Sequence, residues 1–452
     1  MRKGEFLMRA RIRFALPASA PAFSIAHLFA RGLLACIALS AQLTIGAEPA
    51  GSNFSYDEIV PDVFDEETQG FQVNPDIELT AFQQPGTARP PTASRRPTRR
   101  PVASQETSTP TAEDVGDYLA SAPRMFGHYY GSIGQLLQRR LDNNGIFTQG
   151  IVTDLPIGGG ASPLQITDNN NPLPQSRYFV NYNHFENAIR TQSGGRTLFS
   201  PVDQTTVGTE QTFLDGISSW QLQLPMTGGF AAPGNPGVQT GQIGNLGFIS
   251  KTAIWRSDYA ILSGGLGLDL PTGSSVQGQG YQLRNTATGV LPYLGFMALP
   301  TDATFFQGFV TASVPAGGNQ FVVFPPNGGP PQSAGFYNSQ TRLHLDLAGG
   351  IWLNQNPGAG GLTGLALIGE VHYVAATQHG DTLNFTAQSR TGPAIYRLSN
   401  LSNQQTATNI TLGIHTVWND RFQFRIGGAF PLAQFPNRGF DGEVIAQMNF
   451  IP

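Results

Sequence analysis

The most constraining feature of this sequence is an alternation of apolar and polar residues that recurs from about residue 176 to residue 452. RLHLDLAGGIW (342–352), for example, sets Leu343, Leu345 and Leu347 against His344 and Asp346. Successive side chains of a β-strand point to opposite faces, so each such segment predicts a strand with one apolar face and one polar face. The segments are roughly 8–11 residues long, and they predict an all-β fold for this part of the chain.

Two all-β architectures produce strands with one apolar face. A soluble antiparallel sandwich buries the apolar face, whereas a membrane barrel turns it toward lipid and lines its lumen with the polar face. The composition of 54 glycines, 33 prolines and 12% charged residues suits many short strands joined by turns, in either architecture. The sequence has no run of 18 apolar residues, which excludes a bundle of transmembrane helices.

Three features favour the membrane barrel. Aromatic residues such as Trp255, Trp352 and Trp418 lie near strand ends, where interfacial girdles form. The polar faces are rich in Asn, Gln, His and Arg, as expected for a crowded polar interior. Short turns such as WNDR alternate with long loops, which we expect at 227–242, 273–288, 325–340 and 354–363. We therefore predict a transmembrane antiparallel β-barrel over 176–452, with about 12 strands and a range of 10–14.

The polar faces supply the candidate site, a set of side chains expected to line the lumen. These residues are Asn181, Asn183, Gln221, Gln223, Asp269, His344, Asp346, Glu370, His372, His415, Arg421 and Arg425. Asp269 belongs to GGLGLDLPTG (264–273), and we expect it to face the lumen just before a periplasmic-type turn.

His344, Asp346, Glu370 and His372 fall on consecutive predicted strands, so a hairpin would bring them side by side. Interior ion pairs, a pore lining and acid–base chemistry are the three interpretations, in that order of preference. The sequence lacks the GxSxG, HExxH and P-loop motifs, and its one cysteine is Cys36. We therefore predict a protein that is not an enzyme and has no cofactor or metal.

The N-terminal part divides into three regions. Residues 1–47 resemble a signal peptide, because basic residues precede the apolar run 32–47; a lipoprotein anchored at Cys36 is the alternative. Residues 48–113 are acidic and then rich in Pro and Arg, which predicts a disordered linker. Its basic cluster, Arg95–Arg100, is interpreted as a solvated tether; a contact to an anionic envelope polymer or to the acidic stretch before it is the alternative. Without residues 1–47 the chain has 20 basic and 29 acidic residues, which makes nucleic acid an unfavourable partner.

Residues 114–175 form the third region, for which we predict a short helix and a lead-in to the barrel. Ile133, Leu136, Leu137 and Leu141 have helical spacing. Such a helix would cover the rim of the barrel or plug its pore.

Several motifs resemble bacterial outer-membrane barrels of the phenol-degradation-pathway transporter family, which is related in architecture to fatty-acid and aromatic-hydrocarbon channels. They are LGLDLPTG, GNLGFISKTAIW (244–255), RYFVNYNHFENA (177–188), APRMFGHYYG (122–131) and the last strand near Phe450. The resemblance covers residues 122–452. It implies a passive channel for small apolar or amphipathic solutes, with outer-membrane lipid and the barrel-insertion machinery as partners. Barrels of this kind end on an aromatic residue, whereas Ile451 and Pro452 follow Phe450 here.

Two alternatives to a channel remain at this stage. One is a structural or cell-surface barrel without a transport role, and the other is a soluble secreted β-sandwich adhesin.

Overall fold

The computed structural model describes residues 119–127, 129–140, 150–278, 280–325, 329–389, 392–401, 406–434 and 437–452. The predicted signal peptide, Cys36, the linker at 48–113 and the cluster Arg95–Arg100 all lie outside the described residues. No helix in the described ranges is long and apolar enough to cross a membrane.

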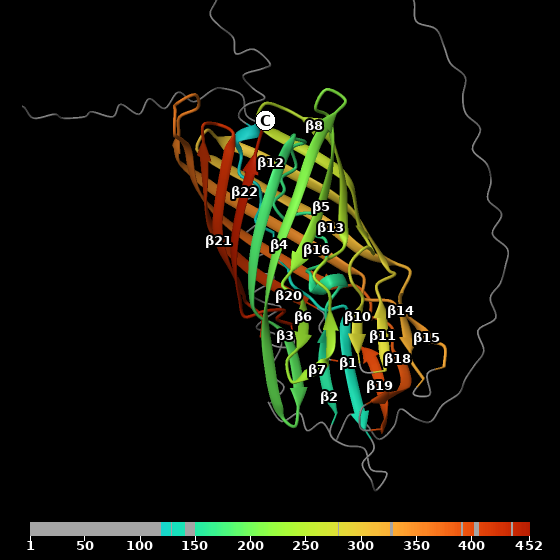
Figure 1. Cartoon of the computed structure of the whole chain (residues 1–452). Helices are drawn as coiled ribbons and strands as arrows, with labels where there is room; N and C mark the ends of the chain where they lie inside the picture. The colour runs from blue at the N-terminus through green and yellow to red at the C-terminus, as the bar shows by residue number, and fades with distance from the viewer. Residues whose placement is uncertain are drawn as a thin grey trace, which may run out of the picture. The chain divides into compact units, whose positions relative to one another are not determined.

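Twelve antiparallel strands close into a barrel (Figure 1). In chain order they are β3 (Arg177–Ser193), β4 (Arg196–Phe213), β5 (Ser218–Thr227), β8 (Leu246–Arg256), β9 (Ala260–Leu270), β12 (Thr288–Thr301), β13 (Thr304–Ala316), β16 (Arg342–Gln355), β17 (Leu362–Ala376), β20 (Thr406–Trp418), β21 (Phe422–Pro431) and β22 (Gly442–Phe450). Each pairs with the next in this order, and β22 pairs with β3 to close the ring. The predicted barrel and its strand number are confirmed.

The alternation places apolar side chains outside the barrel, and the inward faces carry the buried polar side chains together with buried apolar ones such as Phe309. On β20 and β21, Leu412 is 60% exposed and Ile426 is 59% exposed, whereas the neighbouring inward residues His415 and Arg425 are buried. A soluble sandwich requires the opposite arrangement, with its apolar faces buried. The outward face is therefore that of a barrel that crosses a membrane.

The two ends of the barrel differ in the length of their connections. At one end, called the short-turn end, the connections are residues 214–217, 257–259, 302–303, 356–361 and 419–421. At the other, called the long-loop end, four connections carry additional strands. These strands are β6 (Phe230–Ala232), β7 (Asn235–Thr240), β10 (Val276–Gly278), β11 (Tyr281–Arg284), β14 (Asn319–Val323), β15 (Gln332–Tyr337), β18 (Leu383–Ser389) and β19 (Gly392–Ser399).

This arrangement corrects two sequence predictions. The predicted long loop at 354–363 is a turn at the short-turn end, because β16 and β17 extend into it from both sides. Asp269 does not precede a short turn: the chain after β9 continues into β10 and β11 at the long-loop end. The motif LPTG has the composition of a tight turn, but after it the chain forms the paired strands β10 and β11 before it returns to the barrel wall as β12.

The segment before the barrel is also different from the prediction. Only residues 119–121 are helical in its described part, and a short 3-10 turn, η2, covers Gly158–Gly160. The helix expected over Ile133–Leu141 is wrong, because Gly134–Arg140 form strand β1. β1 pairs on one side with β19 and on the other with β2 (Ile151–Leu155), and β2 in turn pairs with β3. These sheet hydrogen bonds outweigh a helical spacing that rests on four residues.

The strands at the long-loop end form two hydrogen-bonded layers. β6, β7, β10, β11, β14 and β15 make a six-stranded sheet, while β18, β19, β1 and β2 extend the barrel sheet at β3. Aromatic residues join the layers: Tyr281 lies 5.2 Å from Phe321, 6.0 Å from Phe385 and 5.1 Å from Tyr396, measured between ring centroids. All four rings are buried, so this end of the molecule has an apolar core of its own.

Candidate functional site

The chain enters the barrel lumen before it forms the wall. In its first pass, the Pro123 carbonyl accepts a hydrogen bond from Gln307 on β13, and Arg124 donates to Gln423 on β21. Further toward the long-loop end, Tyr130 packs on Phe185 of β3. The three wall residues are buried on inward faces of separate strands, so this segment runs along the inside of the barrel.

A second pass brings the chain back to the short-turn end. Along it, hydrogen bonds run to inward side chains of the wall: the Ser162 amide donates to Gln204, the Leu164 amide to Asp269, and the Asn169 side chain to Asn181. The two passes also bond to each other, since the Met125 amide donates to the Asn170 carbonyl. We call residues 119–127, 129–133 and 156–176 together the plug, and β1 and β2 lie between its two passes, outside the long-loop end.

Phe126 is the most closely fitted residue of the plug. Its ring packs on Gly413 and Gly427, which are paired across β20 and β21 and face inward. The Arg425 guanidinium lies 5.3 Å from the ring centroid. Glu370 accepts hydrogen bonds from the backbone amides of Phe126 and Gly127, at 2.8 and 3.4 Å. The wall thus binds this turn of the plug through its ring and its backbone donors.

A second anchor is a buried charge cluster around Glu210 on β4. Its carboxylate accepts hydrogen bonds from the Arg177 guanidinium and the Lys251 ammonium, both at 2.9 Å. Lys251 also donates to the Asn170 side chain at 2.7 Å and to the Leu173 carbonyl at 3.3 Å. The same lysine therefore bonds the wall to the plug, and its charge is balanced by Glu210.

The predicted histidine and carboxylate group is assembled on β16 and β17. His372 Nδ1 lies 2.7 Å from Asp346, and Nε2 lies 2.9 Å from Glu370. His344 does not join this group by a hydrogen bond; its ring meets Tyr129 of the plug edge-on at 5.8 Å. Because carboxylates bind both nitrogens of His372, the arrangement fixes the orientation of the imidazole inside the wall.

The twelve predicted residues separate into two groups in the structure. Eleven have buried side chains on the inward face, where they surround the plug or the lumen near it. Arg421 is the exception and corrects the prediction: it is exposed in the turn 419–421 before β21 begins. Whether the other eleven line a conducting path stays a prediction.

The sequence analysis missed five charged residues inside the barrel. They are Arg124, Arg177, Glu210, Lys251 and Glu443. One signal was available, since Lys251 is the only lysine after residue 3 and sits among apolar residues. Among the described residues, no three His, Cys, Asp or Glu side chains come together as ligands for a metal ion.

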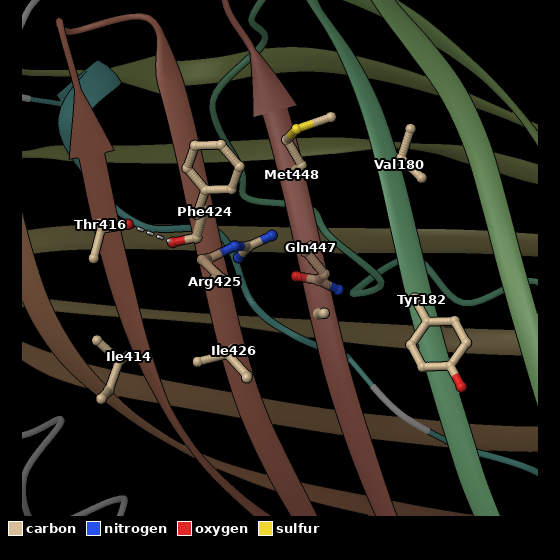
Figure 2. A pocket seen from close by; sticks show the side chains of 10 residues that line it. Val180, Tyr182, Ile414, Thr416, Phe424, Arg425, Ile426, Gln447 and Met448 are labelled. Carbon is tan, nitrogen blue, oxygen red and sulfur yellow. Dashed lines mark hydrogen bonds between the residues drawn. The ribbon is translucent and has the colours of Figure 1, made fainter.

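Two surface hollows lie near the plug but do not pass through the lumen. One, of about 370 Å³, is on the outward face of β20, β21, β22 and β3, where Tyr182, Phe424 and Met448 line it (Figure 2). The other, of about 300 Å³, is at the short-turn end between Leu173 of the plug and the barrel rim. The plug therefore occupies lumen space between the wall strands that it contacts.

No protein-family model matches the chain, and no curated protein matches it. Among solved structures it is similar to the COG4313 outer membrane channel from Pseudomonas putida F1, with 12% identity over 62% of this chain and 96% of that chain and a TM-score of 0.41. It is also similar to the Pseudomonas putida toluene transporter TodX, with 11% identity, coverage of 65% and 94%, and a TM-score of 0.35. The NanC porin gives 8% identity, coverage of 60% and 97%, and a TM-score of 0.35.

Proposed function

We propose that this protein is an outer-membrane channel for small apolar or amphipathic solutes, held closed by its own plug. The observation that carries the proposal is a barrel lumen filled by chain that forms no part of the wall. The plug is bound by side-chain contacts such as those of Phe126 and Lys251. A segment bound in this way can shift while the sheet hydrogen bonds of the wall stay intact.

The width of the barrel supports this interpretation. Eight strands give an interior that side chains alone can fill, and the diameter grows with strand number. Twelve strands therefore enclose a wider space, and here the plug occupies it. Displacement of the plug would leave a water-filled or solute-filled passage.

The charges in the lumen favour uncharged solutes. Ion-selective pores present rings of side chains of one sign. Here both signs lie close together: Arg177 and Lys251 flank Glu210, and His372 lies between Asp346 and Glu370. Such a lining presents no ring of a single sign.

The outer membrane is the location that suits this barrel. In bacterial barrels the short turns face the periplasm and the long loops face outward. This places the short-turn end in the periplasm and the sheets of the long-loop end at the cell surface. Contact with outer-membrane lipid follows from the apolar outward face, and assembly would use the barrel-insertion machinery.

A structural or cell-surface barrel without transport is the second candidate function. It is favoured by the same closed lumen and by the aromatic core at the long-loop end. The two functions differ in one measurable property. A channel conducts when its plug is loosened, whereas a structural barrel with a loosened plug only loses stability.

The test is conductance in planar lipid bilayers of the full-length protein and of Phe126→Ala. We expect the variant to show larger or more frequent openings, because Gly413, Gly427 and Arg425 lose the ring that they bind. Phe424→Ala is the matched control. It removes an aromatic ring from the outward face of β21, the strand whose inward face carries Arg425 and Gly427. Folding of each variant is checked by its shift on a gel with and without boiling. A folded Phe126→Ala protein that conducts no more than the wild type contradicts the channel.

A further inference from the structure

Strand β4 presents polar side chains to the membrane. Its inward residues are Gln204, Thr206 and Glu210, all buried. The alternate, outward positions therefore form a line that is polar except for Val207 at its centre. We call this line the polar stripe, and its residues are Asp203, Thr205, Thr209 and Gln211.

The strand on the opposite side of the barrel shows how unusual this is. In the ring of twelve strands, β16 lies six strands from β4 in either direction. Its outward positions are Leu343, Leu345, Leu347, Gly349, Ile351 and Leu353. β16 is thus suited to contact with lipid along its whole length, whereas β4 is not.

Contacts within the chain satisfy only part of the polar stripe. Asp203 accepts hydrogen bonds from the Tyr182 hydroxyl at 2.6 Å and from His184 at 2.8 Å. The Thr209 hydroxyl donates to the Arg177 carbonyl and accepts a bond from the Gln211 amide. Within the described residues, the Thr205 hydroxyl and the Gln211 side-chain carbonyl have no hydrogen-bond partner. Hydrocarbon cannot supply one, so covering this face is favourable.

We propose that a second copy of this chain covers the polar stripe, giving a dimer with a two-fold axis along the membrane normal. Two copies inserted in the same direction hold each stripe residue at the same depth. Polar positions of one copy therefore meet polar positions of the other. Asp203 already has its partners within the chain. Threonine hydroxyls and glutamine amides both donate and accept hydrogen bonds, so Thr205, Thr209 and Gln211 of two identical stripes can satisfy each other. Such a self-complementary face is what a two-fold interface requires.

This proposal is independent of the channel function. It depends on the outward face of β4, whereas the channel depends on the lumen and the plug. A dimer without conductance, and conductance without a dimer, are both distinguishable results.

The first test is disulfide cross-linking in outer-membrane vesicles. Thr205→Cys, Val207→Cys and Thr209→Cys are each made in a Cys36→Ser background, so each protein has one cysteine. A disulfide requires Cβ atoms about 3.5–4.5 Å apart, which only positions close to the axis achieve. We expect a dimer-sized band on a non-reducing gel for at least one of the three. Leu345→Cys on β16 is the control and should stay monomeric. No cross-link at any stripe position, or an equal yield at Leu345→Cys, overturns the proposal.

The second test measures the mass of the full-length protein in detergent micelles by sedimentation equilibrium. We expect a dimer for the wild type and a monomer for the double variant Thr205→Leu, Thr209→Leu. Leucine is compatible with a lipid-facing surface, so this variant should still fold, which its shift on boiling verifies. Thr416→Leu, an outward threonine on β20, is the matched control and should remain dimeric. A monomeric wild type, or a dimeric double variant, contradicts the proposal.

Discussion

The ring of Phe126 rests against Gly413, where an added Cβ atom would lie 2.4 Å from the ring. Gly427, the residue paired with Gly413 on the next strand, contacts the same ring. Two inward-facing residues without side chains thus create the space in the wall that the plug occupies. This relation couples a small change in the wall directly to the position of the plug.

Gly413→Ala should therefore displace Phe126 and weaken the closed state. Overpacking of a fitted site costs about 1–3 kcal/mol, so the temperature at which the folded form disappears from a gel should fall. Gly369→Ala is the control, because that glycine lies on the adjacent strand β17 and has an open neighbourhood, with the nearest atom 3.7 Å from an added Cβ. Equal effects of the two substitutions would show that Phe126 does not depend on the glycine pair.

Lys251→Met tests the charge cluster that joins wall and plug. It removes one of the two cations that form ion pairs with Glu210. The buried carboxylate then keeps only the ion pair with Arg177. Loss of one partner of a buried ion pair costs about 3–5 kcal/mol, measured as unfolding free energy in urea. Arg438→Met is the control: its pair with Asp441 is 2.8 Å long but only half-buried, and pairs near the surface contribute less than about 1 kcal/mol. A Lys251→Met protein as stable as Arg438→Met would show that Glu210 is balanced without the lysine.

The wall could be predicted from the sequence, whereas the plug could be predicted only as one of two alternatives, in the form of a helix and not of the extended chain found here. A wall strand has lipid on one face and polar groups on the other. Apolar and polar residues therefore alternate in its sequence, as in Leu343–Leu347 of β16. The plug is surrounded by the wall on all sides: Arg124, Phe126 and Tyr130 each contact different strands. A segment that is enclosed on all sides shows no regular spacing of apolar and polar residues, and its contact partners are distant in the sequence.

The missed charged residues have a related explanation. Glu210 is an inward position of β4, and the polar outward face of that strand hides the alternation that would assign it. Arg421 shows the reverse error, because it has the spacing of an inward residue but lies in the turn before β21. The period identifies a face only within the limits of a strand, and strand limits are set by pairing.

Tyr337 on β15 connects the sheets of the long-loop end to the end of the first pass of the plug. Its hydroxyl donates a hydrogen bond of 3.1 Å to the Ile133 carbonyl, beside Gly134 where β1 begins. Burial raises the pKa of Tyr337 from its ordinary value of 10.0 to about 12, although the charge of Arg342 acts in the opposite direction. The neutral hydroxyl is therefore the form that this contact stabilises.

The sign of the pH dependence follows from that raised pKa. The contribution of Tyr337 to stability is full below pH 10.0 and is lost as the pH rises through about 12. We expect the tyrosinate absorbance that distinguishes the wild type from Tyr337→Phe to appear near pH 12. Tyr337→Phe should also lose about 1 kcal/mol of stability at neutral pH, with the loss of one hydrogen bond. A difference spectrum that titrates near pH 10.0 would mean that the hydroxyl is not buried.

The outward face of the wall offers the most direct test of the membrane barrel. Leu345 on β16 and Phe424 on β21 both point outward, and Phe424 is 43% exposed. Arginine at such a position costs about 2–4 kcal/mol at the middle of the bilayer, so Leu345→Arg and Phe424→Arg should each reduce the folded fraction in the membrane. Asp346→Asn, next to Leu345, faces inward, and an amide oxygen can still accept a hydrogen bond from His372. We expect that variant to assemble normally. The measurement is the folded yield in outer-membrane fractions, read from gel mobility before and after boiling. If both arginine variants assemble as well as Asp346→Asn, the outward face is not in contact with hydrocarbon.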